Sequence, residues 1–424
     1  MTSVETSGQP GGGRRSGRGN SVRNADAARR SIADAAYSLF AERSPDQVST
    51  REIGGVAGYS HTLVGRYFGA KANLELLVAE RVVTEYTDIV DAACAECGDG
   101  WPFLGILERL TARPATARLL VRCVLGELPA APLSHPTAGP DRIVDLIAAR
   151  RPGGGPETGP TDAARFGTFA SLGILLGWLS LERFYTAACR LQGVPRAVIV
   201  PAVADACDRT ARAFATERAD LDLPRTRRVR PAPARPPVGR GTAPVRAALL
   251  ASTVDLLAEP GPAAISTREI ARHAGVNQGQ IYHLFGSREE LIAAAFSAST
   301  DGFIDSTITD GSLDVVAATQ EYARSHAPRL ITRLLANDVP IESVRPQFPV
   351  FDSLLARYPE IPTGEPRDGL SDPRLAVLAT GAFYQGSMVW ESVLRASLGI
   401  GSSVDLRPAI ETVIQDLLSI PEHG

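Results

Sequence analysis

The chain has 424 residues, of which 44% are apolar and 21% are charged, and its formal net charge is −3. This length exceeds what one hydrophobic core organises, so two or three domains are expected in an ordinary globular protein. The five cysteines all lie in the first half and form no disulfide framework, which favours a reducing cytoplasm. No window of ~18 to 20 uncharged apolar residues predicts a membrane span, and the N-terminus lacks the apolar core of a signal peptide.

The chain opens with a Gly/Arg-rich segment, residues 1–24, which we expect to be a disordered tail. A first domain at residues 25–71 then begins with an amphipathic helix. Its apolar side chains recur at helical spacing: Ile32, Ala35, Ala36, Leu39 and Phe40.

Two short helices are predicted after this amphipathic helix. The first begins at Ser49 and Thr50, because Ser can cap exposed amide groups and Glu follows in the first turn. Gly58 ends it, since Gly accepts the left-handed conformation of a sharp turn. A third helix, SHTLVGRYF, starts at the cap Ser60. The pattern indicates a helix-turn-helix, whose last helix can lie in a DNA major groove.

Residues 72–220 are predicted to form a larger helical body. Its most apolar stretch, residues 166–181, has no charge in 16 positions, so this helix must be covered on all sides. The next helix is expected to carry Pro201 in its first turn. A Pro/Arg-rich linker follows at residues 221–243, and at ~3.1 Å per residue it spans on the order of 70 Å. Its arginines serve either as solvated linker or as minor-groove contacts.

The second half repeats the first at an offset of 217 residues. The pentapeptide STREI occurs at both Ser49 and Ser266, and ten of the 26 aligned positions that start there are identical. Such a duplication predicts a second helix-turn-helix domain at residues 244–288, with Asn277 as a cap and Gly275 as a helix stop. A second helical body follows at residues 289–420, with an uncharged stretch at 375–390 and a helix that carries Pro408 in its first turn, before a tail at 421–424.

Charge is distributed unevenly between the repeated domains and the rest. Residues 1–71 carry ten Arg or Lys against six Asp or Glu, and residues 225–288 carry ten against three. The remainder is acidic. This asymmetry is expected where only one part of each unit faces phosphates, although solvated surface arginines would give the same count.

Both copies resemble the DNA-binding head of the TetR (tetracycline-repressor-like) family. The motif is T-R-x-I-x-x-x-A-G, followed in the second copy by V-N-x-G-x-I-Y-x-x-F-x-S-R-E-x-L. The resemblance implies an all-α fold of two tandem units, each with a three-helix head and a larger helical body for ligand binding and dimerisation. The first copy departs from the pattern at Gly65, where the family usually has Tyr, and at Thr62, where it usually has Gly.

The resemblance also implies which residues contact double-stranded DNA. Phosphate contacts are expected from Thr50, Lys71, Thr267, Tyr282 and Arg288. Contacts to base edges are expected from Arg51, His61, Thr62, Arg66, Arg268, Gln278, Gln280 and His283. Tyr67 is an alternative phosphate contact in the first head, and Gly279 lies in the second recognition helix. Arg pairs with guanine and Gln with adenine in a bidentate way, which gives ~1 to 3 kcal/mol of discrimination.

A small-molecule effector and a built-in pseudo-dimer are further implications of the resemblance. In the family the last two long body helices form a four-helix bundle with a second subunit, so the two halves of this chain are expected to pack on each other. A homodimer of whole chains is the alternative. The effector pockets are expected to use aromatic side chains, which would otherwise be core: Trp101, Phe169, Trp178, Phe184, Tyr185, Tyr322, Phe351, Phe383, Tyr384 and Trp390.

Two other functions compete with this one. An enzyme is disfavoured, because Cys94-x-x-Cys97 has no second pair and the chain has no P-loop or nucleophile elbow. We therefore expect no catalytic residues, no metal and no cofactor. The other rival is a regulator or interaction protein in which only the second head binds DNA, while the first, with Gly65, is a packing module.

Overall fold

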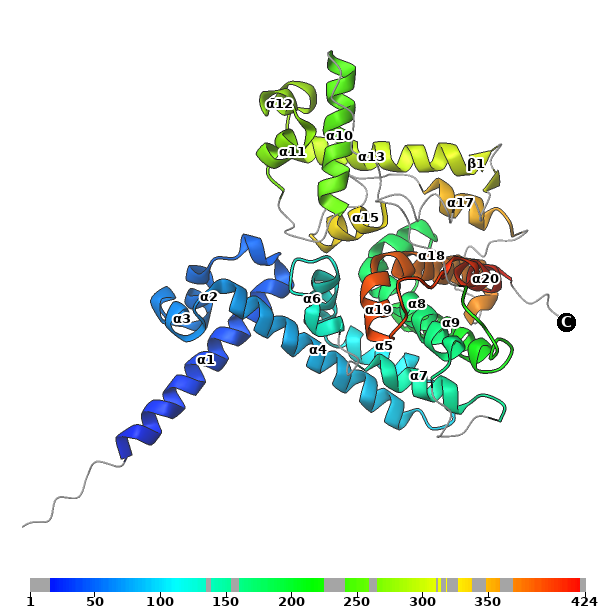
Figure 1. The fold of residues 1–424 in the computed structure, drawn as a ribbon, viewed down its shortest axis with the longest axis horizontal. Helices are drawn as coiled ribbons and strands as arrows, with labels where there is room; N and C mark the ends of the chain where they lie inside the picture. Colours follow the sequence, from blue (N-terminus) through cyan, green and yellow to red (C-terminus); the bar gives the residue numbers. More distant parts are fainter. Residues whose placement is uncertain are drawn as a thin grey trace, which may run out of the picture.

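The structure is a computed structural model of the whole chain. It describes residues 16–134, 139–153, 160–224, 241–258, 265–309, 312–313, 318, 327–337, 348–358 and 369–419. Almost all of these residues are helical, and two domains project from a shared helical mass (Figure 1). The all-α expectation is confirmed, with one addition. Strand β1 (Ile308–Thr309) pairs antiparallel with β2 (Ser312–Leu313), with Ile308 opposite Leu313.

The first head has the predicted three helices. They are α1 (Ser16–Glu42), α2 (Thr50–Ala57) and α3 (His61–Phe68), with a 3₁₀ turn η1 (Pro45–Gln47) between the first two. The Ser49 side chain accepts the Glu52 N–H, and Gly58 ends α2 with φ 77°. The caps and the stop read from the sequence are thus confirmed, because each supplies the hydrogen bond or backbone freedom that a helix end requires.

The tail was expected to continue to residue 24, but α1 begins at Ser16. The expectation was wrong for residues 16–24. The last proline before Pro45 is Pro10, so nothing within α1 interrupts the ladder of backbone hydrogen bonds. Residues 1–15 and 421–424 lie outside the described residues, as does most of the expected linker.

The second head repeats this arrangement in α10 (Thr242–Ala258), α11 (Thr267–Ala274) and α12 (Gly279–Phe285). Ser266 and Glu269 form a full capping box, and the pKa of Glu269 is held below its usual value by the backbone N–H of Ser266. Gly275 ends α11 with φ 67°. The Asn277 side chain accepts the Gly279 N–H at 2.8 Å, but the N-cap residue of α12 is Gln278, so the predicted cap is one residue away from the observed one.

The first body consists of six helices and a 3₁₀ turn. They are α4 (Lys71–Glu96), α5 (Phe103–Thr111), α6 (Pro114–Val124), η2 (Ala131–Ser134), α7 (Pro140–Ala149), α8 (Asp162–Ala188) and α9 (Arg196–Ala215). Pro201 was expected in the first turn of the last helix. It lies instead in the interior of α9, because that helix already begins at Arg196, just after Pro195.

The described helical segments of the second body are mostly shorter than those of the first. They comprise α13 (Arg288–Thr307), α15 (Ala327–Ala336), α17 (Pro349–Leu355), η3 (Gly369–Ser371), α18 (Pro373–Val389), α19 (Glu391–Ser397) and α20 (Arg407–Leu418). Pro408 is in the first turn of α20, as predicted. Figure 1 shows α8, α9, α18 and α20 lying together, so the apolar helices of the two halves share one core.

Small residues let α8 and α18 cross with their backbones in contact. A Cβ added at Gly177 would lie 1.8 Å from the Ala382 carbonyl oxygen, and one added at Gly386 would lie 1.8 Å from that of Gly173. Each helix therefore presents a small-xxx-small pair to the other, Gly173 with Gly177 and Ala382 with Gly386. The Tyr185 hydroxyl also donates to Gly381 O across this crossing at 2.9 Å.

Helix α8 is long and apolar enough to cross a membrane by composition, but 83% of its most apolar window is buried inside the protein. The expectation that it is covered all round is confirmed, since α9 and α18 pack on it. The helix is interrupted at Leu181, whose φ of −136° and ψ of 28° are not helical. This kink redirects the last turns of α8.

Buried polar groups form a second contact between the halves. Arg122 pairs with Glu127 at 2.5 Å, and both side chains are almost completely buried. Arg122 also donates to Ala336 O at 3.2 Å, and Arg333 donates to Leu125 O at 2.8 Å. Asn337 donates to Glu127 at 3.2 Å. We refer to Arg122, Glu127, Arg333 and Asn337 as the buried polar cluster.

Candidate nucleic-acid interface

In the first head, α3 is held by its inner face and leaves its outer face open. Val64 and the α2 residue Ile53 are buried in the head core. Ser60 caps the helix by accepting the Leu63 N–H at 3.3 Å. The opposite face is exposed, and it carries most of the predicted DNA contacts of this head: Arg51, His61, Thr62 and Arg66 are exposed, while Thr50 and Tyr67 are half-buried.

In the second head, α12 is anchored by Ile281 and Phe285, which are buried. Its outer residues are exposed, including Tyr282, of which 55% is accessible. The remaining predicted contacts lie around it: Arg268, Gln278, Gly279, Gln280 and His283 are exposed, and Thr267 is half-buried. Gln278 donates to the Thr267 hydroxyl at 2.7 Å, so the start of α11 and the start of α12 are tied together.

The two predicted phosphate contacts that open the long body helices also brace the heads. Lys71 donates to the Pro45 carbonyl, and Arg288 donates to the Ile265 carbonyl at 2.7 Å. Both residues occupy the same place in the repeat and fasten the loop that precedes the helix-turn-helix. Each side chain is half-buried. A contact with DNA from either residue would therefore come from a side chain whose position is already fixed.

Sequence reasoning missed one arginine in each head. The Arg29 guanidinium lies 5.3 Å from the centre of the Tyr67 ring, and that of Arg246 lies 5.1 Å from the centre of the Phe285 ring. Both arginines are exposed and both lie on the first helix of their head, 217 residues apart. That shared offset was the signal that would have found them. Stacking on an aromatic ring places a positive charge beside each recognition helix.

The first head is joined to its body by a network around Glu85. The Tyr37 hydroxyl donates to Glu85 at 2.6 Å, and the Thr116 hydroxyl donates to the same oxygen at 2.8 Å. Burial and the bond to Glu85 raise the pKa of Tyr37 to about 12, so the hydroxyl keeps its proton at neutral pH. The network joins α1, α4 and α6, and it therefore ties the first head to its body.

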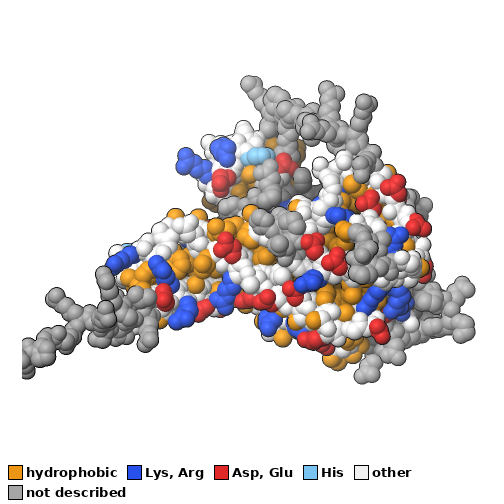
Figure 2. Space-filling model, turned by 60° about the horizontal axis from the view of Figure 1, so that its bottom comes forward, with side chains coloured by type: hydrophobic (Ala, Val, Ile, Leu, Met, Phe, Trp, Pro, Cys, Tyr) orange, Lys and Arg blue, Asp and Glu red, His pale blue; other side chains and the backbone are white. Residues whose placement is uncertain are grey.

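The outer surfaces of the two heads differ. Helix α2 reads Gly54, Gly55 and Val56 where α11 reads Ala271, Arg272 and His273. Val56 is 61% exposed, so an apolar side chain replaces a polar one at this place. A Cβ added at Gly54 would lie 2.7 Å from Tyr59 O, so the turn of the first head approaches α2 more closely than a side chain at this position permits. Figure 2 shows Lys and Arg side chains on both projecting heads, with a histidine beside those of the second.

Comparison with known protein families supports a helix-turn-helix head in each half of the chain. Residues 32–76 and 249–295 each match the family described as bacterial regulatory proteins, tetR family. Each half of the chain therefore carries a domain of the tetR family.

The relatives of this chain include helix-turn-helix regulators of mycobacteria. An HTH-type transcriptional repressor of Mycobacterium tuberculosis and an HTH-type transcriptional regulator of Mycobacterium bovis are each 28% identical to this chain over 195 residues. The match covers 97% of each relative but 45% of this chain. Each relative therefore has about half the length of this chain, which carries two tetR-family domains and is a DNA-binding transcriptional regulator.

The aromatic residues that were predicted to line effector pockets lie in several parts of the structure. Phe169, Trp178, Phe383 and Trp390 are buried in the core that includes the α8–α18 crossing. Phe184, Tyr185 and Phe351 form a cluster of rings with Phe348 between the two bodies. The others are apart from these: Trp101 lies under the Arg150 guanidinium, Tyr384 donates to Ala318 O, and Tyr322 lies outside the described residues. Their contact with an effector stays a prediction.

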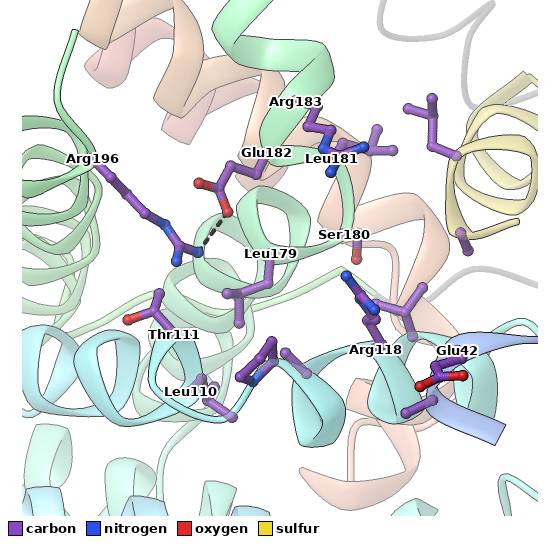
Figure 3. Close-up of a pocket in the computed structure, with 16 residues that line it drawn as sticks. Glu42, Leu110, Thr111, Arg118, Leu179, Ser180, Leu181, Glu182, Arg183 and Arg196 are labelled. Carbon is purple, nitrogen blue, oxygen red and sulfur yellow. Dashed lines mark hydrogen bonds and ion pairs between the residues drawn. The ribbon is translucent and has the colours of Figure 1, made fainter. Parts of the chain in front are cut away.

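A cavity of about 590 Å³ lies elsewhere, where the first head, the first body and α15 meet (Figure 3). None of the predicted aromatics lines this cavity. It is bounded by the end of α1 at Ala41 and Glu42, by α5 and α6, by the kinked part of α8, and by Leu335 and Ala336 of α15. We refer to it as the junction pocket. Hydrophobicity and aromatic spacing could not reveal it, because its walls come from five separate segments of the chain.

Cys94 and Cys97 lie at the end of α4, and both are free thiols. Burial, followed by the neighbouring Cys97, raises the pKa of Cys94 to about 11, so this thiol is protonated at neutral pH and a poor nucleophile. The Cys97 thiol donates to Cys94 O at 3.3 Å. Among the described residues, no group of three or more His, Cys, Asp or Glu could hold a metal ion.

Proposed function

We propose that this protein is a cytoplasmic, one-component transcriptional repressor that a small-molecule effector releases from DNA. Its two heads read unlike half-sites. The observation that carries this proposal is the difference between the recognition helices, because SHTLVGRYF and NQGQIYHLF share only their last residue. A symmetric dimer requires a palindrome because its two recognition helices are identical. Two unlike helices call for an asymmetric operator.

A single chain supplies both heads in this proposal. The backbone contact between α8 and α18 supports it, since the helices that would join two subunits are here joined within one chain. The Trp390 indole N–H also donates to the Ser180 hydroxyl across the two halves at 3.2 Å. A homodimer of whole chains is the alternative, and the sizing experiment below separates the two.

Selection of bound duplexes from random DNA tests the operator. The expected result is a pair of unlike half-sites about one helical turn apart or more, bound by one chain per duplex in sedimentation of the complex. A perfect inverted repeat bound by one chain would overturn the proposal. An inverted repeat bound by two chains would show that like heads pair between molecules.

A second candidate function is favoured by the surface of the first head. Gly55, exposed Val56 and Gly65 stand where the second head has Arg272, His273 and Tyr282, so the first head offers fewer groups to a phosphate backbone. In this alternative only the second head binds DNA. The first head is then a packing module.

Salt dependence distinguishes the two candidates. We expect Arg51→Ala with Arg66→Ala in the first head, and Arg268→Ala with Arg272→Ala in the second, each to weaken binding by about tenfold or more. Each pair should also make the plot of log affinity against log salt shallower by about 1, because fewer counterions are released. Fluorescence anisotropy with the selected duplex measures both quantities. Arg142→Ala on α7 is the control and should change neither. If the first pair changes neither, the packing-module alternative holds.

Gly65→Tyr should strengthen DNA binding by the first head. A Cβ at Gly65 meets nothing within 4 Å, so a side chain fits without strain on the outer face of α3. Tyrosine would place there the hydroxyl that Tyr282 carries in the second head, and a hydrogen bond to a charged group contributes about 1.5 kcal/mol or more, which is roughly a tenfold change in affinity. The matched control is Gly65→Phe, which adds the ring and the helix propensity without the hydroxyl. Equal affinities of the two variants would show that this face of α3 does not meet phosphates.

A further inference from the structure

We infer that the junction pocket binds an amphipathic anion, a molecule with an apolar body and one carboxylate or phosphate group. This inference rests on the proposed function only in treating the molecule as the effector. The pocket has the size of ordinary small-molecule sites, which are roughly 300 to 1,000 Å³. It is also the place where three parts of the protein meet.

The walls of the junction pocket combine apolar and polar surface in about equal parts. Leu110, Val121, Leu179 and Leu335 contribute aliphatic side chains from α5, α6, α8 and α15. These aliphatic side chains favour a ligand with an apolar body, because contact with them removes apolar ligand surface from water.

The charged side chains that line the pocket indicate which charge the ligand carries. Three arginines and two glutamates line it. Arg196 is paired with Glu182 at 2.5 Å, as the dashed line in Figure 3 marks. Arg118 and Arg183 have no ion-pair partner within the described part of the chain. Two guanidinium groups thus remain available for an anion, and guanidinium binds carboxylate and phosphate oxygens through two parallel hydrogen bonds.

The kink in α8 brings the second of these arginines to the pocket. Leu181, the non-helical residue, lines the cavity together with Ser180 before it and Arg183 after it. In Figure 3 Arg118 lies close to Ser180, and Arg183 lies beside Leu181. The Ser180 hydroxyl is engaged with Leu176 O and with the Trp390 indole. It therefore holds the kink rather than a ligand.

A ligand in this pocket would bear on the relative position of the two heads. The pocket is bounded by Glu42 at the end of the first head's α1 and by Ala336 of the second unit. Arg122 of the buried polar cluster donates to both of their backbone carbonyls, at 3.5 Å and 3.2 Å. An anion that prefers one separation of these two residues shifts the equilibrium between head arrangements, and that preference sets how strongly it changes DNA affinity.

Binding of three twelve-carbon probes to the full-length protein tests the inference. Dodecanoate and dodecyl phosphate carry the anion, and dodecanol carries the same tail without charge. Calorimetric titration should show binding of at least one anion and at least tenfold weaker binding of the alcohol. Stronger binding of one anion than the other identifies the head group. Binding of none of the three, or equal binding of the alcohol, would overturn the inference.

Three substitutions test where the anion binds, because they are expected to change its affinity in opposite directions. Arg118→Met and Arg183→Met should each weaken binding of the better anion about tenfold, whereas Glu42→Gln should strengthen it severalfold by removing a like charge. Arg142→Met, outside the pocket, is the control. A variant that fails to fold cannot bind the anion more strongly, so stronger binding by Glu42→Gln could not come from a loss of folding. Unaltered affinities in all three pocket variants would place the probe elsewhere. Operator affinity measured with and without the anion is a separate readout. Binding without any effect on DNA would leave the site standing and remove the effector role.

Discussion

Gly177→Ala is expected to separate the packed halves of the protein, although it adds one methyl group. The added carbon would lie 1.8 Å from Ala382 O and 2.9 Å from the Gly386 backbone nitrogen. These are backbone atoms of another helix, which cannot rotate away as a side chain does. Overpacking of a core costs about 1 to 3 kcal/mol, and an overlap with backbone should reach or exceed the upper end. Urea denaturation should show this loss in the free energy of unfolding.

Gly55→Ala is the matched control for this experiment. Gly55 also lies in a helix, but a Cβ there meets nothing within 4 Å. Alanine is favoured over glycine inside a helix by up to about 1 kcal/mol, so this variant should be as stable as the parent or more so. Small-angle scattering would show an expanded particle for Gly177→Ala alone. Equal stability of both variants would mean that α8 and α18 do not cross at Gly177 in solution.

Glu127→Gln should be the most damaging substitution of a charged residue in the described core. Glu127 pairs with Arg122 and accepts from Asn337, and the buried Arg333 lies close enough to be influenced by its charge. Burial lowers the pKa of Arg333, which shows that its charge is already desolvated. Without the carboxylate, Arg122 loses its buried ion-pair partner and Arg333 loses a nearby negative charge. Removal of one partner of a buried pair costs about 3 to 5 kcal/mol.

Chemical denaturation measures this loss, and a double substitution shows its cause. Glu127→Leu together with Arg122→Met removes both charges and should recover much of the stability, because apolar replacements of a buried pair are often neutral. Glu96→Gln removes an exposed partner of Arg109 and should change stability by about 1 kcal/mol or less. If Glu127→Gln were as mild as Glu96→Gln, the buried polar cluster would be open to water.

The heads were predictable from the sequence because local chemistry decides them. Ser49 and Ser266 begin helices, Gly58 and Gly275 end them, and these features recur at one offset. Contacts between distant segments were not predictable in the same way. An aromatic residue in an apolar helix looks the same in sequence whether it lines a cavity or fills a core, so the sequence could not distinguish these two roles for the buried Phe169.

The junction pocket and the buried polar cluster were beyond sequence reasoning for a related reason. Arg122 is one arginine among many in the chain, and nothing local shows that Glu127 neutralises it. Its other partners, Ala336 and Asn337, lie more than 200 residues away. The kink at Leu181 likewise lies at the end of an apolar run that contains neither proline nor a charge. These features depend on how two divergent copies of one unit meet.

The crossing of α8 and α18 within one chain has a consequence for how the protein responds to its own abundance. Two separate subunits must find each other, so the share of paired molecules falls as the protein becomes scarce. Partners on one polypeptide experience an effective local concentration on the order of millimolar, whatever the number of copies in the cell. Occupancy of an operator would therefore rise in simple proportion to the amount of protein, without the threshold that pairing imposes, and a few molecules per cell would suffice to keep a gene under control.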